Sequence, residues 1–266
     1  MSTIRELDLA RVAAIMRDVA GHDLSGRLAS IVNRIEGRLR ATGAHSVAEY
    51  LARVDRDEAE RTAMVEALCV HETSFFREAR HFELLREIAR AWRAKRGAPR
   101  TFRVWSAAAS TGEEAFSIAM VLLDEIPREL GLHVEIAATD LSAAALARAE
   151  AAMWPTARLA EIPMRSRAHV VEQGSMFGVR PEVRQLVRFS RENLVALSPQ
   201  LTGPFEIVFC RNVLFYLTRP LRTAVLASIA ARLAPGGLLF LGHADSSLDA
   251  RGLKFVEPGV LRVEPR

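Results

Sequence analysis

The stretch Thr101–Met120, TFRVWSAAASTGEEAFSIAM, decides the fold. Residues 102–105 form the apolar run of a buried strand, and Ser106–Gly112 carries almost no side-chain bulk. Glu113 and Glu114 then begin a helix, because negative side chains favour the free backbone N–H groups of a first turn. A strand that leads through small residues into a helix is typical of open α/β sheets that bring a ligand close to the backbone.

The turn itself narrows the kind of ligand. It lacks the G-x-G-x-x-G pattern of dinucleotide-binding turns. Small side chains followed by acids suit a ligand with an amino group and hydroxyls better than one with a pyrophosphate. The alternative is an ordinary strand-to-helix turn with no ligand.

The composition of the whole chain excludes several classes of protein. Its 266 residues can form one large domain or two smaller ones. No run of apolar residues is long enough for a membrane span, and the first residues lack a signal-peptide core. The two cysteines, Cys69 and Cys210, predict no disulfide framework, so we expect a cytoplasmic protein. No Cys/His cluster has zinc spacing, and a net charge of +4 does not require nucleic acid.

The first 96 residues are predicted to be helical. Apolar residues recur at helical spacing in five segments, near 7–20, 25–42, from 46, 57–70 and 80–96. The segment 25–42 is rich in arginine (Arg27, Arg34, Arg38, Arg40), so it is either a docking face for an acidic partner or a solvated helix face. The Gly97-Ala98-Pro99 sequence separates these helices from the rest of the chain.

From Phe102 onward, strands alternate with helices, which predicts a parallel α/β sheet. The expected strands are 102–106, 133–139, 206–210 and 238–242, and the expected helices are 113–125, 142–152 and 219–233. Short strands near 254–256 and 260–263 could close an antiparallel edge. Residues 155–204 interrupt the alternation and read as a small β-rich insertion, with strand-like pieces at 170–172, 176–179 and 186–189.

Polar residues follow three of the expected strands, at the edge where open α/β sheets bind ligands. Besides the Ser106–Glu113 turn, these are Asp140 and the pair Arg211-Asn212. Asp140 could accept hydrogen bonds from two ribose hydroxyls, or it could cap the next helix. Arg211 and Asn212 lie inside an apolar run and need partners, which a ligand or the neighbouring backbone could supply.

A second polar segment, VHETSFFREARHF, joins the fourth and fifth helices. Its adjacent residues Phe75 and Phe76 are expected to be buried and to carry their polar neighbours into a cleft, or simply to pin a helix connection. Tyr216, four residues beyond Asn212, could offer a hydroxyl to the same cleft.

Taken together, these segments resemble the chemotaxis-receptor methyltransferases, which use S-adenosylmethionine to esterify protein glutamates. The motifs occur in the family's order over residues 65–245: HETSFFRE, VWSAAASTGEEAFSIAM, IAATDLS, ENL, FEIVFCRNVLFYL and LAPGGLLFLGH. The resemblance implies a helical domain (1–78), a linker helix (79–100) and a Rossmann-like methyltransferase domain (101–266) that contains the β-rich insertion.

The resemblance also implies roles for single residues. Glu113 would bind the methionine end of the cofactor and Asp140 its ribose. The other cofactor-binding positions would be His71, Thr73, Arg77, Asn193, Leu194, Arg211 and Asn212. Tyr216 and Arg93 would lie near the transferred methyl group. The partner would be the cytoplasmic helical region of methyl-accepting chemotaxis receptors, bound through helix 25–42 and the β-rich insertion. The resemblance implies no metal, no nucleic-acid partner and no insertion into the membrane.

Two departures from the family pattern leave alternatives open. His71 replaces the usual Asn, and Ala152-Met153-Trp154 replaces the usual Gly-x-Tyr. These differences favour a catalytically weak cofactor-binding regulatory module of the same fold. A nucleic-acid methyltransferase is the other alternative, but the loop Arg211–Leu214 lacks the Asn/Asp-Pro-Pro-Tyr/Phe sequence of adenine amino methylation.

Overall fold

The computed structural model describes residues 5–24, 28–95, 101–126, 131–245 and 252–264. The chain forms two compact units. The first consists of residues 1–70 together with Phe215–Ala224, and the second of His71–Leu214 together with Val225–Arg266. The Gly97-Ala98-Pro99 break and Arg27 lie outside the described residues.

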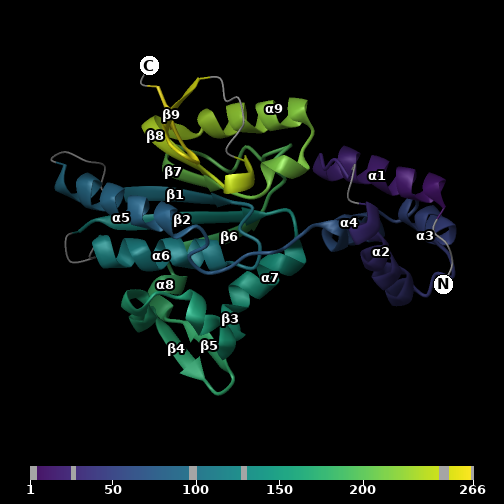
Figure 1. The fold of residues 1–266 in the computed structure, drawn as a ribbon, viewed down its shortest axis with the longest axis horizontal. Helices are drawn as coiled ribbons and strands as arrows, with labels where there is room; N and C mark the ends of the chain where they lie inside the picture. Colours follow the sequence, from purple (N-terminus) through teal and green to yellow (C-terminus); the bar gives the residue numbers. More distant parts are fainter. Residues whose placement is uncertain (1–4, 25–27, 96–100, 127–130, 246–251, 265–266) are drawn as a thin grey trace. The chain divides into compact units, whose positions relative to one another are not determined.

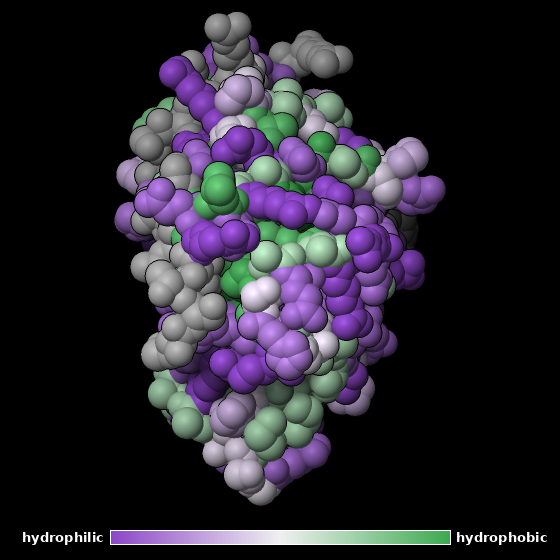
Figure 2. All heavy atoms as spheres, turned by 90° about the vertical axis from the view of Figure 1, so that its right-hand side faces the viewer, coloured by the Kyte–Doolittle hydropathy of each residue, from purple (hydrophilic) through white to green (hydrophobic). Residues whose placement is uncertain are grey.

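The first unit is helical, as the sequence predicts. Its helices are α1 (Glu6–Ala20), α2 (Leu28–Thr42), α3 (Val47–Val54) and α4 (Glu58–Leu68). Ser46 caps α3 by accepting a hydrogen bond from the Glu49 N–H, and Glu49 in turn accepts one from the His45 N–H. The space-filling view in Figure 2 shows mainly hydrophilic side chains with smaller hydrophobic areas between them.

Two arginines of α2 are engaged inside this unit. Arg38 forms a salt bridge with Glu60 of α4, and Tyr50 of α3 donates a hydrogen bond to the same carboxylate at 2.6 Å. Arg34 donates to the carbonyl oxygen of Cys69. Arg40, by contrast, is exposed. The arginine-rich pattern of α2 is therefore explained in part by packing against α4, and only in part by a solvent-facing charge.

A segment from late in the chain completes the helical unit. Tyr216 ends the short 3-10 turn Leu214–Tyr216, and its carbonyl oxygen accepts a hydrogen bond from the Asp23 N–H at 2.6 Å. The Tyr216 ring stacks on His22, and Leu217 forms an isolated β-bridge with His22.

The second unit contains a seven-stranded sheet. In spatial order the strands are β6 (Val187–Arg191), β2 (His133–Asp140), β1 (Thr101–Ala107), β7 (Phe205–Cys210), β8 (Leu233–Leu241), β10 (Val260–Val263) and β9 (Leu253–Glu257). The first five are parallel, and the final hairpin is antiparallel. The strand order reverses between β1 and β7, which makes this point the topological switch of a doubly wound, Rossmann-like sheet.

Helices cover both faces of this sheet, with α6 (Glu113–Glu125) on one side and α9 (Arg219–Ala230) on the other (Figure 1). Helix α7 (Ala143–Ala151) follows β2. Helix α6 is buried nearly all round, from Ala115 to Leu122, because it packs against the sheet, against α5 (Ala79–Ala94) and against the insertion. A helix that is apolar on every side needs such complete cover.

The insertion contains a separate three-stranded sheet beyond α6 (Figure 1). Its strands are β3 (Met153–Pro155), β4 (Val170–Gln173) and β5 (Met176–Val179); two 3-10 segments (Thr156–Glu161, Met164–His169) and α8 (Pro181–Arg184) accompany them. An aromatic cluster joins it to the rest of the unit, because Trp154 contacts Phe75, Phe116 and Phe177.

Two elements differ from the sequence-based expectation. The strand-like piece 186–189 is β6 of the main sheet and not part of the insertion, because it pairs in parallel with β2 from Ile136 to Asp140. The expected linker helix, α5, belongs to the second unit, where Phe82 and Leu85 are fully buried and Arg86 pairs with Glu125 of α6.

Candidate functional site

The candidate site lies within the second unit, at the carboxyl ends of β1, β2 and β7. The turn Ser106–Gly112 follows β1, Asp140 ends β2, and Arg211-Asn212 follows β7. Because these strands are parallel neighbours, their carboxyl ends share one edge of the sheet. The structure therefore brings together the three polar groups that the sequence predicted at strand ends.

Backbone strain is concentrated around this edge. Among the described residues, six non-glycine residues have positive φ. Five of them lie in the segment after α4 or in the turns after β1 and β7: Phe76, Glu78, Ala108, Ser110 and Asn212. Such conformations cost energy and persist where surrounding contacts enforce them, which is common at ligand-binding sites.

Asp140 is buried and already oriented by the backbone. Its Oδ2 accepts a hydrogen bond from the Ser110 N–H at 2.8 Å, and its Oδ1 accepts one from the Ser142 N–H at 2.9 Å. Ser142, not Asp140, is the N-cap of α7, since its hydroxyl accepts from the Ala145 N–H. A carboxylate has about four acceptor positions, so Asp140 retains acceptor capacity toward a ligand.

Glu113 is completely buried at the start of α6. Its Oε1 accepts a hydrogen bond from Trp154 Nε1 at 3.0 Å and pairs with Arg158, and its Oε2 accepts from the Thr111 hydroxyl at 2.7 Å. Sequence reasoning did not identify Arg158 as a neighbour of Glu113. It singled out Trp154 only as a departure from a family pattern.

Arg211 is almost fully buried between two carboxylates. It donates to Glu114 Oε2 at 3.0 Å and lies 3.3 Å from Glu78 Oε2. Burial raises the pKa of Glu114 despite the nearby Arg211 and the Ser106 hydroxyl. Burial acts the same way on Glu78 and is the largest single effect there, but Arg211, the His243 N–H and His81 together outweigh it, so the pKa of Glu78 lies below its usual value. Neither Glu114 nor Glu78 was predicted as a site residue.

Asn212 lies close to the chain where β8 ends. A Cβ atom at Gly242 would be 2.5 Å from Asn212 Nδ2 and 2.7 Å from its backbone nitrogen. Glycine is therefore required at this position if Asn212 is to keep its place.

Asn193 and Leu194 follow β6 and come next to the end of β2. The preceding residue, Glu192, donates its N–H to the Asp140 carbonyl oxygen at 3.0 Å. Asn193 Oδ1 accepts from the Val195 N–H, which shapes a local turn. Both residues are half-buried.

The segment His71–Arg77 lies against the same edge. The Ser110 hydroxyl donates to the His71 carbonyl oxygen at 3.4 Å, and the Arg77 carbonyl oxygen accepts from Arg211. Arg158 donates a hydrogen bond to the Thr73 carbonyl oxygen at 2.9 Å. Phe75 and Phe76 are buried, as the sequence predicted.

Arg93 does not lie with this group. Arg93 donates to the carbonyl oxygen of Glu125, at the opposite end of α6 from Glu113. A helix of 13 residues is about 20 Å long, so Arg93 lies far from Glu113 in the second unit. Tyr216 belongs to the helical unit described above.

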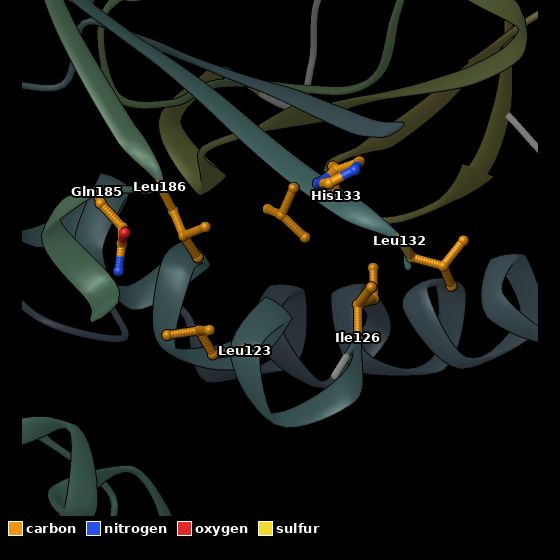
Figure 3. Close-up of a pocket in the computed structure, with 7 residues that line it drawn as sticks. Leu123, Ile126, Leu132, His133, Gln185 and Leu186 are labelled. Carbon is orange, nitrogen blue, oxygen red and sulfur yellow. The ribbon is translucent and has the colours of Figure 1, made fainter. Parts of the chain in front are cut away.

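A separate hollow lies at the other end of the sheet (Figure 3). It has a volume of about 360 Å³ and lies between the end of α6 and the start of β2. The lining side chains are mostly apolar, with His133 and Gln185 the polar exceptions. This hollow therefore lacks the carboxylates found at the candidate site.

Neither a metal cluster nor a membrane-spanning helix occurs in the described part of the chain. No group of three or more His, Cys, Asp or Glu side chains there could hold a metal ion. No helix in those ranges has the length and apolarity to cross a membrane.

Comparison with known proteins gives the family. The family model of the CheR methyltransferase SAM-binding domain matches residues 71–256, and that of the CheR all-alpha domain matches residues 7–69. The chain belongs to the CheR methyltransferase family. It is an S-adenosylmethionine-dependent methyltransferase.

Named relatives of this CheR-family chain cover most of its length. Chemotaxis protein methyltransferase 2 of Pseudomonas aeruginosa is 35% identical, over 92% of this chain and 89% of the relative. A chemotaxis protein methyltransferase of Klebsiella aerogenes is 36% identical, over 89% of this chain and 82% of the relative. A probable biofilm formation methyltransferase, WspC, of P. aeruginosa is 33% identical, over 90% of this chain and 57% of the relative.

The residues at the strand ends of this CheR-family chain fit the cofactor. S-adenosylmethionine carries an ammonium group and two ribose hydroxyls and has no phosphate. Asp140 ends β2, and Glu113 begins α6 directly after the small-residue turn that follows β1. Carboxylates accept hydrogen bonds from both kinds of group with charge-assisted strength.

Proposed function

We propose that this protein transfers the methyl group of S-adenosylmethionine to glutamate side chains of chemotaxis receptors and forms methyl esters. The observation that carries the proposal is the pair of buried carboxylates, Asp140 at the end of β2 and Glu113 at the start of α6, within a chain of the CheR family. The named chemotaxis methyltransferases among the relatives supply the class of substrate.

Within this proposal each residue of the site has one task. Asp140 accepts the ribose hydroxyls, and Glu113 accepts the ammonium group of the methionine end. Asn193 and Leu194 flank the adenosine. The remaining positions that bind the cofactor or close the site around it are His71, Thr73, Arg77, Arg211 and Asn212.

The chemistry needs little from the protein beyond positioning. S-adenosylmethionine supplies an electrophilic methyl group on a sulfonium. A receptor glutamate is already ionised near neutral pH, because the ordinary pKa of a glutamate side chain is about 4.3, so no general base is required. Holding the reacting atoms in line, with water excluded, is the main contribution. Tyr216 orients the receptor carboxylate by its hydroxyl.

The receptor would be met by two surfaces. The arginine-rich helix α2 offers exposed Arg40 to an acidic coiled coil, and attraction between opposite charges speeds such encounters. The three-stranded sheet offers β4 as an edge strand to which an extended receptor segment could add.

A labelling experiment tests the function. The protein is incubated with methyl-labelled cofactor and membranes rich in a chemotaxis receptor, and the label is then challenged with mild base. We expect base-labile label on the receptor, lost when the receptor's methylation-region glutamates are replaced by alanine. Tyr216→Phe should lower turnover while cofactor affinity is kept. Label that resists base, or that persists on the alanine receptor, would contradict glutamate as the acceptor.

A further inference from the structure

Arg158 connects three segments that are far apart in the sequence. Its guanidinium contacts Glu113 at the start of α6 and donates to the Thr73 carbonyl oxygen at 2.9 Å. It also makes two hydrogen bonds of 2.9 Å to Glu161, three residues further along its own 3-10 segment. Its side chain keeps 27% of its surface exposed, whereas Glu113 has none.

Glu161 also contacts the segment between α4 and α5, to which Thr73 belongs. Its Oε2 accepts a hydrogen bond from the Phe75 N–H at 2.9 Å. The insertion therefore holds the 73–75 backbone at two points, through Arg158 and through Glu161. Phe75 adds an apolar contact, since its ring packs edge-on against Trp154 with centroids 4.9 Å apart.

A carboxylate buried as deeply as Glu113 needs partners, because an unpaired charge in the interior is costly. The described contacts supply two neutral donors, Trp154 and Thr111, and one cation, Arg158. Together they use two acceptor positions on Oε1 and one on Oε2. About four positions exist on a carboxylate, so Oε2 keeps one for a further donor.

We propose that Arg158 is a positioning residue for the amino-acid end of S-adenosylmethionine. By pairing with Oε1 of Glu113, it aims the remaining acceptor position of Oε2 at the ammonium group of the cofactor. By binding the Thr73 carbonyl oxygen, it fixes residues 73–75 next to the Glu113 carboxylate. This inference rests on the role proposed above for Glu113.

The experiment compares two nucleosides that differ only in the amino-acid end. S-adenosylhomocysteine carries it, and 5′-methylthioadenosine lacks it. Both are titrated calorimetrically into the full chain as wild type, as Arg158→Met and as Arg158→Lys. Arg167→Met is the matched control, because Arg167 binds the Ile162 and Leu159 carbonyl oxygens of the same insertion.

We expect Arg158→Met to weaken S-adenosylhomocysteine binding roughly tenfold or more and to leave 5′-methylthioadenosine binding unchanged. Arg158→Lys should fall between, because lysine restores the charge without the planar fork. Arg167→Met should bind both nucleosides as wild type does.

Three results would overturn the inference, and they separate it from the proposed function. Equal weakening of both nucleosides would indicate a general structural role for Arg158. If Arg158→Met bound both nucleosides as the wild type does, and the wild type formed receptor esters, only the role of Arg158 would be refuted. A wild type that binds neither nucleoside would refute this inference and the proposed function together.

Discussion

Arg211 Nη1 donates a hydrogen bond to Glu114 Oε2 at 3.0 Å, although 97 residues separate the two in the sequence. Arg211 follows β7 and Glu114 lies in the first turn of α6, so the pair spans the switch point of the sheet. The Ser106 hydroxyl donates to the other oxygen of Glu114 at 2.7 Å. The loops on either side of the switch point are thus held by one ionic network.

Replacing Arg211 with methionine should strongly destabilise the second unit. The change leaves Glu114 and Glu78 mostly buried without their cation, which typically costs about 3–5 kcal/mol. Urea unfolding followed by fluorescence would measure the loss. The double variant Arg211→Met/Glu114→Gln should recover part of it, because one buried charge is then removed. A single variant as stable as wild type would show that the network contributes nothing.

Asp140→Ala should reduce cofactor affinity. The change removes the predicted acceptor of the ribose hydroxyls and also frees the Ser110 N–H, which loosens the turn after β1. We expect S-adenosylhomocysteine to bind roughly tenfold more weakly or worse by calorimetry. Asp124→Ala, at the far end of α6, is the control and should bind normally. An Asp140→Ala protein with wild-type affinity would remove the ribose role.

The main sheet could be predicted from the sequence because its signals are local. The run Thr101–Met120 contains a strand, a turn and a helix in succession, and each has its own residue pattern. The insertion was harder to delimit. Residues 186–189 look like any short strand, and only pairing with β2, about 50 residues earlier, places them in the main sheet.

The carboxylates of the site were predictable, whereas the residues that hold them were not. Asp140 and Glu113 stand at fixed places after a strand and at a helix start. Arg158 lies 45 residues from Glu113, in a 3-10 segment without periodicity. Its ordinary surroundings in the sequence, PTARLAE, give no signal of a buried partner. Arg93 was expected near the transferred methyl group from the family resemblance alone, and its contact with the Glu125 carbonyl oxygen depends on how α5 packs against α6.

His81 should make stability depend on pH. It is buried on α5 near Glu78, Glu257, Arg211 and His243, and burial, followed by Arg211, lowers its pKa to about 4. In the unfolded chain His81 takes up its proton near its ordinary pKa of 6.5. Between pH 6.5 and about pH 4, the unfolded chain therefore binds more protons than the folded protein. Stability is therefore lost as the pH falls through this window.

Unfolding free energies at about pH 7.5 and about pH 5 would measure the effect, which we expect to be about 2 kcal/mol for His81. His81→Gln should lose that share of the pH dependence. His45→Gln, at an exposed position, should keep it. Parallel pH profiles for wild type and His81→Gln would contradict the assignment.

Gly242→Ala should disturb the site through Asn212. The added Cβ would come within 2.5–2.7 Å of the side chain and the backbone nitrogen of Asn212, which holds a positive φ of 57°. Because backbone cannot move aside cheaply, we expect a loss of about 1–3 kcal/mol in stability together with weaker binding of S-adenosylhomocysteine. Thermal unfolding with and without this nucleoside would measure both effects.

Gly37→Ala is the matched control, since a Cβ there meets no atom within 4 Å. Alanine inside helix α2 should raise stability by about 0.5–1 kcal/mol without changing nucleoside binding. If Gly242→Ala behaved like Gly37→Ala, the close approach of the β8 end to Asn212 would not matter for the site. Asn212 would then be free to take another position without loss of cofactor.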